Sequence, residues 1–402
     1  MTRGITRTFI LTAAVAVLVA GTPAAASAQR VQVEARVSPD VRQDLREALR
    51  EVTSSIAAAI RDISSDLSKE LGHIDRDVNR DVAKGLSDGL RGLSALANAG
   101  TWNQGGERNW NSKADDRQTR TLAIGASGTM EINNLSGDVK VTAGSGRDAG
   151  VEIIRHARGR TDADARLGLE RVKVDVQVTG SRAVVKSDYP NERQSPYSVS
   201  IDIIVSAPAG TRLTINGVSG DILVSGIKGD LTVKTVSGDI VLSNVGAVSE
   251  AKTASGDLTI TGAATDGSLD VGTLNGDLRL QNVKARRLTA GTVSGDVVLT
   301  DVSAETVEMN TMSGDAVFSG TLAPNGRYEI TAHSGDVRFT PAGATGFALT
   351  ARSFNGDVSA SMALQNESRS RRQSLSGKVG DGSATVTLKT FSGDITVGTK
   401  KR

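Results

Sequence analysis

The sequence contains no cysteine and few aromatic residues or prolines, and each shortage narrows what the protein can be. Without cysteine there can be no disulfide, no thiolate metal site, no cysteine nucleophile and no lipid attached to an N-terminal cysteine. Phe, Trp and Tyr make up 3% of 402 residues, which is too few for a conventional large core. Proline occurs 7 times against 44 glycines, a balance that favours many short strands joined by tight glycine turns.

Residues 1–28 have the pattern of a signal peptide. Arg3 and Arg7 form a positive start, an apolar run extends from Phe9 to Ala20, and Ala26-Ser27-Ala28 is a small-x-small cleavage signal. The apolar run is short for a membrane span, so a retained anchor is the less favoured alternative. We expect export to the periplasm, the cell surface or the medium, cleavage near Ala28 and no transmembrane span in the mature chain.

The overall charge argues against a nucleic-acid partner. The chain has 47 Lys and Arg residues, and loss of Arg3 and Arg7 leaves 45 of them against 45 Asp and Glu residues. A formally neutral chain has no overall electrostatic footprint for nucleic acid.

After a short lead at 29–40, residues 41–97 have the pattern of a long amphipathic helix. The apolar residues are separated by steps of 4, 4 and 3, an 11-residue period that gives a nearly straight stripe on a helix. The stripe must be buried, either by self-association as a coiled coil or by packing on the rest of the chain. Its polar face carries both signs of charge, which disfavours a membrane surface. The stripe begins with Val41, Leu45, Leu49, Val52, Ile56, Ile60, Ile63, Leu67 and Leu71.

The rest of the chain is predicted to be β-rich. Residues 98–120 are polar and are interpreted as a linker. Residues 121–215 alternate apolar and polar side chains, as in the run from Val172 to Val178, but irregularly. We expect them to form the irregular first strands, or a cap, of the β body that follows.

A Ser/Asn-Gly-Asp turn recurs through residues 216–398 and is the most informative feature of the sequence. From Gly220 onward, the steps between its glycines are 18, 18, 20, 19, 19, 21 and 21, and then 37, which is close to two periods. A period near 20 indicates a repeat architecture in which each repeat buries its apolar face against its neighbours. Residues 399–402 form a basic tail. The glycines are Gly220, Gly238, Gly256, Gly276, Gly295, Gly314, Gly335, Gly356 and Gly393.

Each repeat has a short strand, the turn, a second short strand and a loop. Glycine is expected where the turn requires positive φ, and the flanking Ser, Asn and Asp can bond the amides of their own turn. A meander of antiparallel hairpins and a β-solenoid both fit this order. The near-constant period favours a parallel, β-helix-like solenoid, because equivalent residues then stack in register about 4.8 Å apart.

The stretch from Val205 to Val224, with its Pro-x-Gly segment, and the repeats after it resemble the bacterial "putative adhesin" family of domains of unknown function. The resemblance covers roughly residues 121–398 and implies an exported, repeat-rich β-solenoid. It brings no catalytic residues with it. The helical segment at 41–97 is an addition to the family's usual pattern.

The repeated aspartates could have a chemical role. If stacked about 4.8 Å apart, neighbouring carboxylates repel by roughly 0.9 kcal/mol even in the dielectric of water. Capping of backbone amides would offset this repulsion and is the favoured interpretation. The alternative is calcium bound between successive coils, although Ca²⁺ requires six or more ligands. The residues of such a ladder would be Asp239, Asp257, Asp277, Asp296, Asp315, Asp336 and Asp357.

An enzyme is disfavoured, and we expect no cofactor. The histidines His73, His156 and His333 are far apart in the sequence, and no serine-nucleophile, zinc-protease or phosphate-loop motif is present. His333 occupies a position that is apolar in most other repeats. We therefore predict an adhesin-like envelope or surface protein that binds a polymer or another protein. A self-assembling envelope scaffold is the alternative, and a polysaccharide-active β-helix enzyme is the remote one.

Overall fold

The computed structural model describes residues 110–398, apart from 191–194, 344 and 371–372. The expected signal peptide, lead, helical segment and basic tail therefore lie outside the described residues. By its internal contacts the chain divides into Met1–Gly106 and Glu107–Arg402, and the described residues belong to the second unit.

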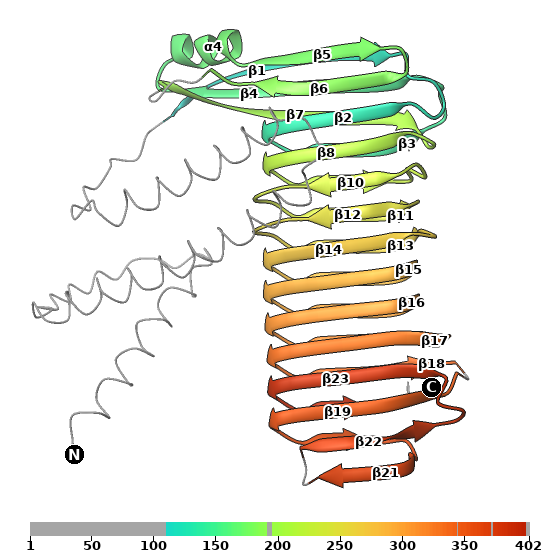
Figure 1. Cartoon of the computed structure of the whole chain (residues 1–402). Helices are drawn as coiled ribbons and strands as arrows, with labels where there is room; N and C mark the ends of the chain where they lie inside the picture. Colours follow the sequence, from blue (N-terminus) through green and yellow to red (C-terminus); the bar gives the residue numbers. More distant parts are fainter. Residues whose placement is uncertain (1–109, 191–194, 344, 371–372, 399–402) are drawn as a thin grey trace, which may run out of the picture. The chain divides into compact units, whose positions relative to one another are not determined.

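The second unit is a β-solenoid built from stacked coils (Figure 1). In one regular coil, β8 (Arg212–Ser219) leads into the turn and β9 (Ile222–Ser225) follows it. Ile222 and Val224 are buried, whereas Leu223 between them is exposed. The period-two pattern of the sequence thus places one set of side chains between the two strands of a coil and the other set outside.

The strands form two faces, and within each face the regular coils pair in parallel and in register. The leading face contains the strands that run into the turns, and the following face contains those that leave them. The parallel pairing confirms the predicted solenoid for this part of the chain and excludes a hairpin meander. In stacking order, the leading face is β2 (Thr129–Ser136), β8, β10 (Leu231–Lys234), β12 (Val248–Lys252), β14 (Ser268–Asn275), the second halves of β15 (Leu278–Ser294), β16 (Val297–Ser313) and β17 (Ala316–Ser334), then β23 (Ala384–Ser392) and β19 (Phe347–Asn355).

The following face has the same order of coils. Its strands connect to those of the leading face through the Ser/Asn-Gly-Asp turns, so the core is a narrow layer between the two faces. The faces together contain ten coils. The strands of the following face are β3 (Val139–Gly144), β9, β11 (Ile240–Val245), β13 (Leu258–Ala264), the first halves of β15, β16 and β17, then β18 (Val337–Ala342), β24 (Ile395–Val397) and β20 (Val358–Ala360).

The core is mainly aliphatic, as the low aromatic content requires. Ile215, Ile240 and Leu299 are fully buried examples from successive regions of the stack. Apart from Tyr197 at the N-terminal end, the buried aromatic residues gather in the C-terminal coils, where the rings of Phe318 and Phe339 stack with their centroids 5.0 Å apart. A layer one side chain deep per face is thus enough for burial, because every coil is also covered above and below.

The order of the last coils differs from their order in the sequence. The coil of β23 and β24 lies between the coil of β17 and β18 and that of β19 and β20. The 37-residue step between Gly356 and Gly393 therefore does not contain a second regular coil. It contains β21 (Gln365–Ser370) and β22 (Ser374–Val379), which pair antiparallel with each other, and β22 pairs antiparallel with β19.

The N-terminal end is closed by antiparallel strands and a helix. On one face β5 (Lys173–Thr179) pairs with β6 (Arg182–Asp188), which continues in parallel to β2. On the other, β1 (Ser112–Leu122), β4 (Ala149–Gly159) and β7 (Tyr197–Pro208) pair antiparallel, and β7 continues in parallel to β3. Residues 121–215 thus provide a cap and also one regular coil, that of β2 and β3.

The prediction of a linker at residues 98–120 is wrong for its last part, because residues from Ser112 onward form β1 and belong to the β body. The prediction missed this strand because its residues are almost all polar. As an outer strand of the cap, β1 has one side accessible to water, and its alternation in burial is not matched by an alternation in hydrophobicity.

The helix α4 (Asp162–Arg171) packs on this cap. It starts with a capping box in which the Thr161 hydroxyl accepts a hydrogen bond from the Asp164 amide at 3.2 Å. At the C-terminal end of α4, Arg155 of β4 donates hydrogen bonds to the carbonyls of Leu169 and Val172 at 2.8 and 2.9 Å. No helix in the described part of the chain is long and apolar enough to cross a membrane.

Candidate functional site

The glycines of the turns are held in a conformation and a contact that exclude other residues. Gly295 has φ of 144°, and a Cβ there would lie 2.1 Å from the carbonyl oxygen of Gly276 in the preceding coil. The turns therefore stack with direct backbone contact. At Gly356 only the close approach applies, because its Cβ would lie 2.1 Å from the Gly393 oxygen while its φ is outside the positive region.

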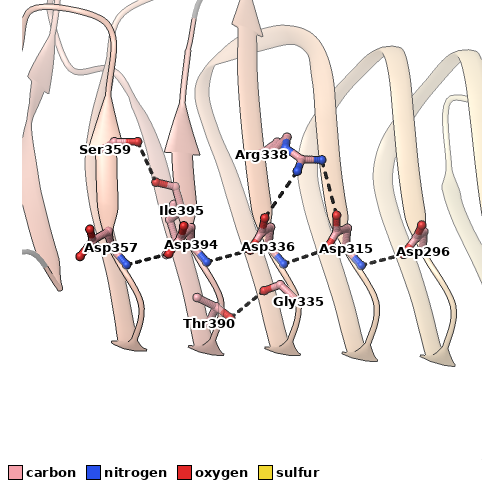
Figure 2. Close-up of polar contacts among 10 residues, drawn as sticks. All are labelled: Asp296, Asp315, Gly335, Asp336, Arg338, Asp357, Ser359, Thr390, Asp394 and Ile395. Carbon is pink, nitrogen blue, oxygen red and sulfur yellow. Dashed lines mark hydrogen bonds and ion pairs between the residues drawn. The ribbon is translucent and has the colours of Figure 1, made fainter. Parts of the chain in front are cut away.

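The aspartates of the turns form a continuous ladder along the solenoid, and Figure 2 shows its C-terminal part, from Asp296 to Asp357. One carboxylate oxygen of each Asp accepts a hydrogen bond from the backbone amide of the Asp in the next coil, as from Asp315 to Asp296 at 2.8 Å. The turn residues alone predicted a bond within the same turn, so the partner differs from the one expected. The stacked coils decide this partner, because they bring the two turns together. The donor–acceptor distances are 2.8–3.0 Å for the pairs Asp138–Asp202, Asp221–Asp138, Asp239–Asp221, Asp257–Asp239, Asp277–Asp257, Asp296–Asp277, Asp315–Asp296, Asp336–Asp315, Asp394–Asp336 and Asp357–Asp394.

The ladder begins with a residue that sequence reasoning missed. Asp202 of β7 belongs to no Ser/Asn-Gly-Asp turn, yet it accepts from the Asp138 amide at 3.0 Å. Its other oxygen lies 3.4 Å from Nε2 of His156, whose Nδ1 is 2.8 Å from Asp115. The one available signal was an outward-facing aspartate between Ile201 and Ile203 in the alternating strand.

Tyr189 lies close to this start of the ladder. Its hydroxyl donates to the Val199 carbonyl at 3.2 Å. Burial, and then the nearby charge of Asp202, raise the pKa of the Tyr189 phenol, so it remains a neutral donor. The group therefore acts as a structural anchor for the cap.

Two arginines offset part of the repulsion between the carboxylates. Arg279 lies 2.6 Å from Asp277 and 3.6 Å from Asp257, and Arg338 lies 3.4 Å from Asp336 and 3.5 Å from Asp315. Each arginine thus spans two successive coils through the oxygens that the amides leave available, as Figure 2 shows for Arg338. Amide bonds and arginines together offset part of the repulsion expected between stacked carboxylates.

Calcium between the coils stays a prediction. The described residues contain no group of three or more His, Asp or Glu side chains positioned to hold a metal ion. The ladder instead offers successive single carboxylates, one oxygen of which already accepts an amide. Ca²⁺ would require several further oxygens at each site.

Buried hydroxyl groups support the turns from inside. The residue two positions before the Ser or Asn of the turn is a threonine in most coils, and its hydroxyl donates to the carbonyl of the turn glycine in the preceding coil. These bonds satisfy carbonyls that the tight turn would otherwise leave unpaired. The pairs, at 2.8–3.2 Å, are Thr253–Gly238, Thr273–Gly256, Thr292–Gly276, Thr311–Gly295, Thr390–Gly335 and Ser353–Gly393.

The residue directly before the Ser or Asn of each turn points to solvent and is mostly apolar. We call this column the apolar stripe. It contains eight of the eleven large hydrophobic residues that are exposed in the described chain, with exposed fractions from 36% at Leu274 to 69% at Phe354. In stacking order its members are Leu135, Val218, Val236, Ala254, Leu274, Val293, Met312, His333, Phe391 and Phe354.

The C-terminal part of the stripe is aromatic. The ring of Phe391 stacks on those of His333 and Phe354, with centroid separations of 5.0 and 4.8 Å. His333 is thus a member of the stacked column, in agreement with its interpretation as a substitution in an apolar position. Sequence reasoning recognised this position in the repeat but gave no indication that it faces solvent.

A third column, two residues before the stripe, carries basic and uncharged side chains. Lys234 and Lys252 flank Glu250 at 2.7 and 3.1 Å, and Lys252 also contacts Asp270 at 2.6 Å. Burial acts to raise the pKa of Glu250, but its bonds and charge interactions with Lys234 and Lys252 outweigh burial and the pKa is lowered. The outer side of the leading face therefore carries a charged network beside the stripe.

Comparison with known families identifies the solenoid. The family model described as Toastrack DUF4097 matches residues 129–398, which includes all ten coils. This match confirms the resemblance that the repeats and the Pro-x-Gly segment suggested. A search of curated proteins found no match.

Several crystal structures are similar to this chain at low identity. A "putative cell adhesion protein" from Clostridium sporogenes ATCC 15579 is 11% identical, with 72% of this chain and 100% of that chain covered and a TM-score of 0.21. A "putative lipid binding protein" from Parabacteroides distasonis ATCC 8503 is 13% identical, with 71% and 97% covered and a TM-score of 0.42. A "putative adhesin" from Bacteroides fragilis NCTC 9343 is 12% identical, with 70% and 97% covered and a TM-score of 0.36. None of these likenesses is a basis for assigning a function.

Proposed function

The chain belongs to the Toastrack DUF4097 family, and from this premise we propose that it is an exported, non-enzymatic interaction protein of the cell envelope or surface. In this proposal it binds its partner, a polymer or another protein, along the edge formed by the turns. The observation that carries the proposal is the apolar stripe, in which valine, leucine, methionine and phenylalanine side chains stay exposed from the first coil to the last.

Exposure of this kind requires an explanation. Single apolar side chains at a protein surface are ordinary, but a continuous exposed column favours a role in binding. The stripe is not needed to bury the core, since every second residue of the same strands already points inward. The stacked coils also hold it rigid, so a partner would find it preorganised.

The test compares stripe variants with a variant on the opposite face. The chain would be labelled and incubated with intact cells, isolated sacculi and outer-membrane fragments, with and without calcium. Val293→Ser combined with Met312→Ser should weaken retention about tenfold or more, because burial of one such side chain contributes about 1.5 kcal/mol or more. Leu223→Ser is the control, because Leu223 is 40% exposed but lies on the following face.

Equal retention of the stripe variant and the control would reject the stripe as the binding surface. The non-enzymatic assignment would be rejected if the unmodified chain released fragments from an acidic polysaccharide and a variant with a pair of ladder aspartates substituted did not. Calcium-dependent retention would support a role for the aspartate ladder in binding the partner.

A self-assembling envelope scaffold is the second candidate, and the ends of the solenoid restrict its form. The last strand, β21, is polar and carries the ion pair of Glu367 and Arg369. The other end finishes with β1 and β5, whose outer edges pair with no other strand of the described residues but which carry charged residues. Charged edges oppose the addition of further strands, so end-to-end growth of the solenoid is disfavoured. Any assembly through the solenoid would then be lateral.

A further inference from the structure

We propose that the partner of the apolar stripe is a second copy of this chain, which packs beside the first with the two solenoids parallel and in register. This inference rests on the proposed function for one premise, that the turn edge is the interaction surface. It adds the identity of the partner and the geometry of the pair.

The dimensions of the stripe show that its flanks must take part in any stable contact. Ten coils at about 4.8 Å give a stripe roughly 43 Å long. A stable interface buries about 800 Å² on each partner, so a contact of this length must be roughly 19 Å wide. That width exceeds one column of side chains, and the columns on both sides of the stripe therefore decide which partner fits.

The two flanks differ in charge. On one side of the stripe lies the ladder of turn aspartates. On the other side lies the column two residues before the stripe, which contains basic and uncharged residues but no acidic one. We call it the basic column. Its members in stacking order are Asn133, Asn216, Lys234, Lys252, Gly272, Gly291, Asn310, Thr331, Lys389 and Arg352.

This asymmetry selects one orientation for a pair. If the twofold axis runs along the solenoid, the stripe of one copy meets the stripe of the other, and the basic column of each faces the aspartate ladder of its partner. If the copies are antiparallel, basic columns face each other and aspartate ladders face each other. Like charges brought together oppose association, so the parallel pair is favoured.

The heights of the charges also match in the parallel pair. Lys234 lies in the same coil as Asp239, and Lys389 lies in the same coil as Asp394. Within the described part of the chain, neither of these aspartates has an ion-pair partner of its own. In register, the lysine of one copy is level with the aspartate of the other. Each lysine would reach that aspartate while keeping the glutamate of its own chain, Glu250 at 2.7 Å for Lys234 and Glu329 at 2.9 Å for Lys389.

The coils in the middle need less help from a partner. There Arg279 and Arg338 already contact four carboxylates of their own chain, and the column residue is uncharged in three of these four coils, the exception being Lys252 in the coil of Asp257. Within the described residues, a column lysine and an aspartate without an ion pair of its own thus occur together in the coils of Asp239 and Asp394.

Two glycines in the basic column permit close approach. Gly272 and Gly291 lie in the interior of strands β14 and β15, neither has positive φ, and a Cβ would meet nothing closer than 3.4 and 3.7 Å respectively. The backbone therefore does not require glycine at either position. Bare backbone there lets the turns of a second copy lie against the middle of the strand surface.

The absence of cysteine allows a direct test with single substitutions in the full chain. Val218→Cys lies in the second coil and Phe391→Cys in the ninth, both on the stripe. In the parallel pair each variant faces its own copy, so each alone should give a disulfide-linked dimer on mild oxidation at micromolar concentration. Leu223→Cys, exposed on the following face, is the control and should stay monomeric on a non-reducing gel.

The same variants identify the competing arrangements. In an antiparallel pair the second coil would face the ninth, so only a mixture of the two variants would cross-link, and this result would overturn the proposal. A dimer detected by sedimentation without cross-linking at either stripe position would also overturn it, because it would place the contact elsewhere, such as in residues 41–97.

Failure of the proposed parallel pair can be distinguished from failure of the proposed function. If the stripe variants lose retention on the envelope fractions while no stripe disulfide forms, the stripe binds a foreign partner and the second copy is rejected. If the disulfides form but retention does not depend on the stripe, the pair stands and the envelope partner must bind another surface.

Discussion

The middle and the ends of this solenoid are stabilised by different means. In the middle, β14, β15 and β16 repeat one set of contacts in every coil, and the turn, its amide bond and its buried hydroxyl all act between neighbours. At the ends there is no next coil, and antiparallel strands, a capped helix and a side chain such as Arg155 close the stack. A repeat protein thus needs two kinds of contact, one that joins each coil to the next and one that closes the ends of the stack.

The largest expected effect is at a turn glycine of the middle coils. Gly295→Ala should lower the free energy of unfolding by about 3 kcal/mol or more, because alanine is strained at this φ and its Cβ would overlap the Gly276 carbonyl. Gly272→Ala is the matched control, with ordinary strand conformation and room for a Cβ, and should be neutral or slightly stabilising. Urea unfolding measures both. Equal losses in the two variants would show that the turns are not the feature that propagates the stack.

The next effect is at the N-terminal cap. Arg155→Met should cost about 3 kcal/mol, since it removes the arginine donor from the Leu169 and Val172 carbonyls and leaves the Asp116 carboxylate without its positive partner. The hydrogen bond from Arg155 is also the main reason that the pKa of Asp116 is lowered. Hydrogen exchange should show opening of β1, β4 and α4 before the middle coils. Uniform loss of protection along the whole chain would argue against a cap that is stabilised separately.

A smaller effect separates the two roles of the aspartate ladder. Asp296→Ala removes the acceptor for the Asp315 amide and should cost about 1–2 kcal/mol. Asp296→Asn keeps an acceptor oxygen and removes a charge, so it should be close to neutral or stabilising. Thermal unfolding at low protein concentration distinguishes them. If asparagine is as harmful as alanine, the negative charge of the ladder residue matters more than the presence of an acceptor oxygen.

The smallest effect concerns pH and the charged network on the leading face. The folded-state pKa of Glu250 is lowered from its ordinary value of 4.5, so its contribution to stability is present above about pH 4.5 and is lost as pH falls through the folded pKa. Glu250→Gln should therefore reduce the acid sensitivity of the unfolding free energy, by less than about 1 kcal/mol because the ion pairs are partly exposed. Identical pH profiles for the variant and the unmodified chain would contradict this coupling.

The sequence predicted the middle far better than the ends, for a physical reason. A strict period arises only if equivalent residues have equivalent neighbours, so the spacing from Gly220 to Gly356 was enough to infer stacked parallel coils. The cap lacks such a constraint. The polar strand β1 looks like a linker, and the 37-residue step to Gly393 suggests two periods, although the chain forms an antiparallel pair and then returns to insert one coil.

The candidate site could be predicted in part. The positions of the turn aspartates follow from the repeat, but Asp202 does not, because it joins the ladder from a strand of the cap. The column that contains Val293 and Met312 was recognisable as a regular apolar position. Its exposure was not, since alternation around a tight turn leaves the direction of the last residue undefined until the neighbouring coils are in place.

The sequence by itself determined what each coil repeats: the alternation that fills a thin core, the glycine that the turn demands, and the aspartate beside it. These are local properties, because backbone conformation and side-chain periodicity depend on near neighbours along the chain. Only the tertiary structure decided which turn each aspartate bonds, the order of the last coils, and the exposure of the apolar stripe. Those properties depend on which coil lies next to which in space, and distant parts of the chain settle that together.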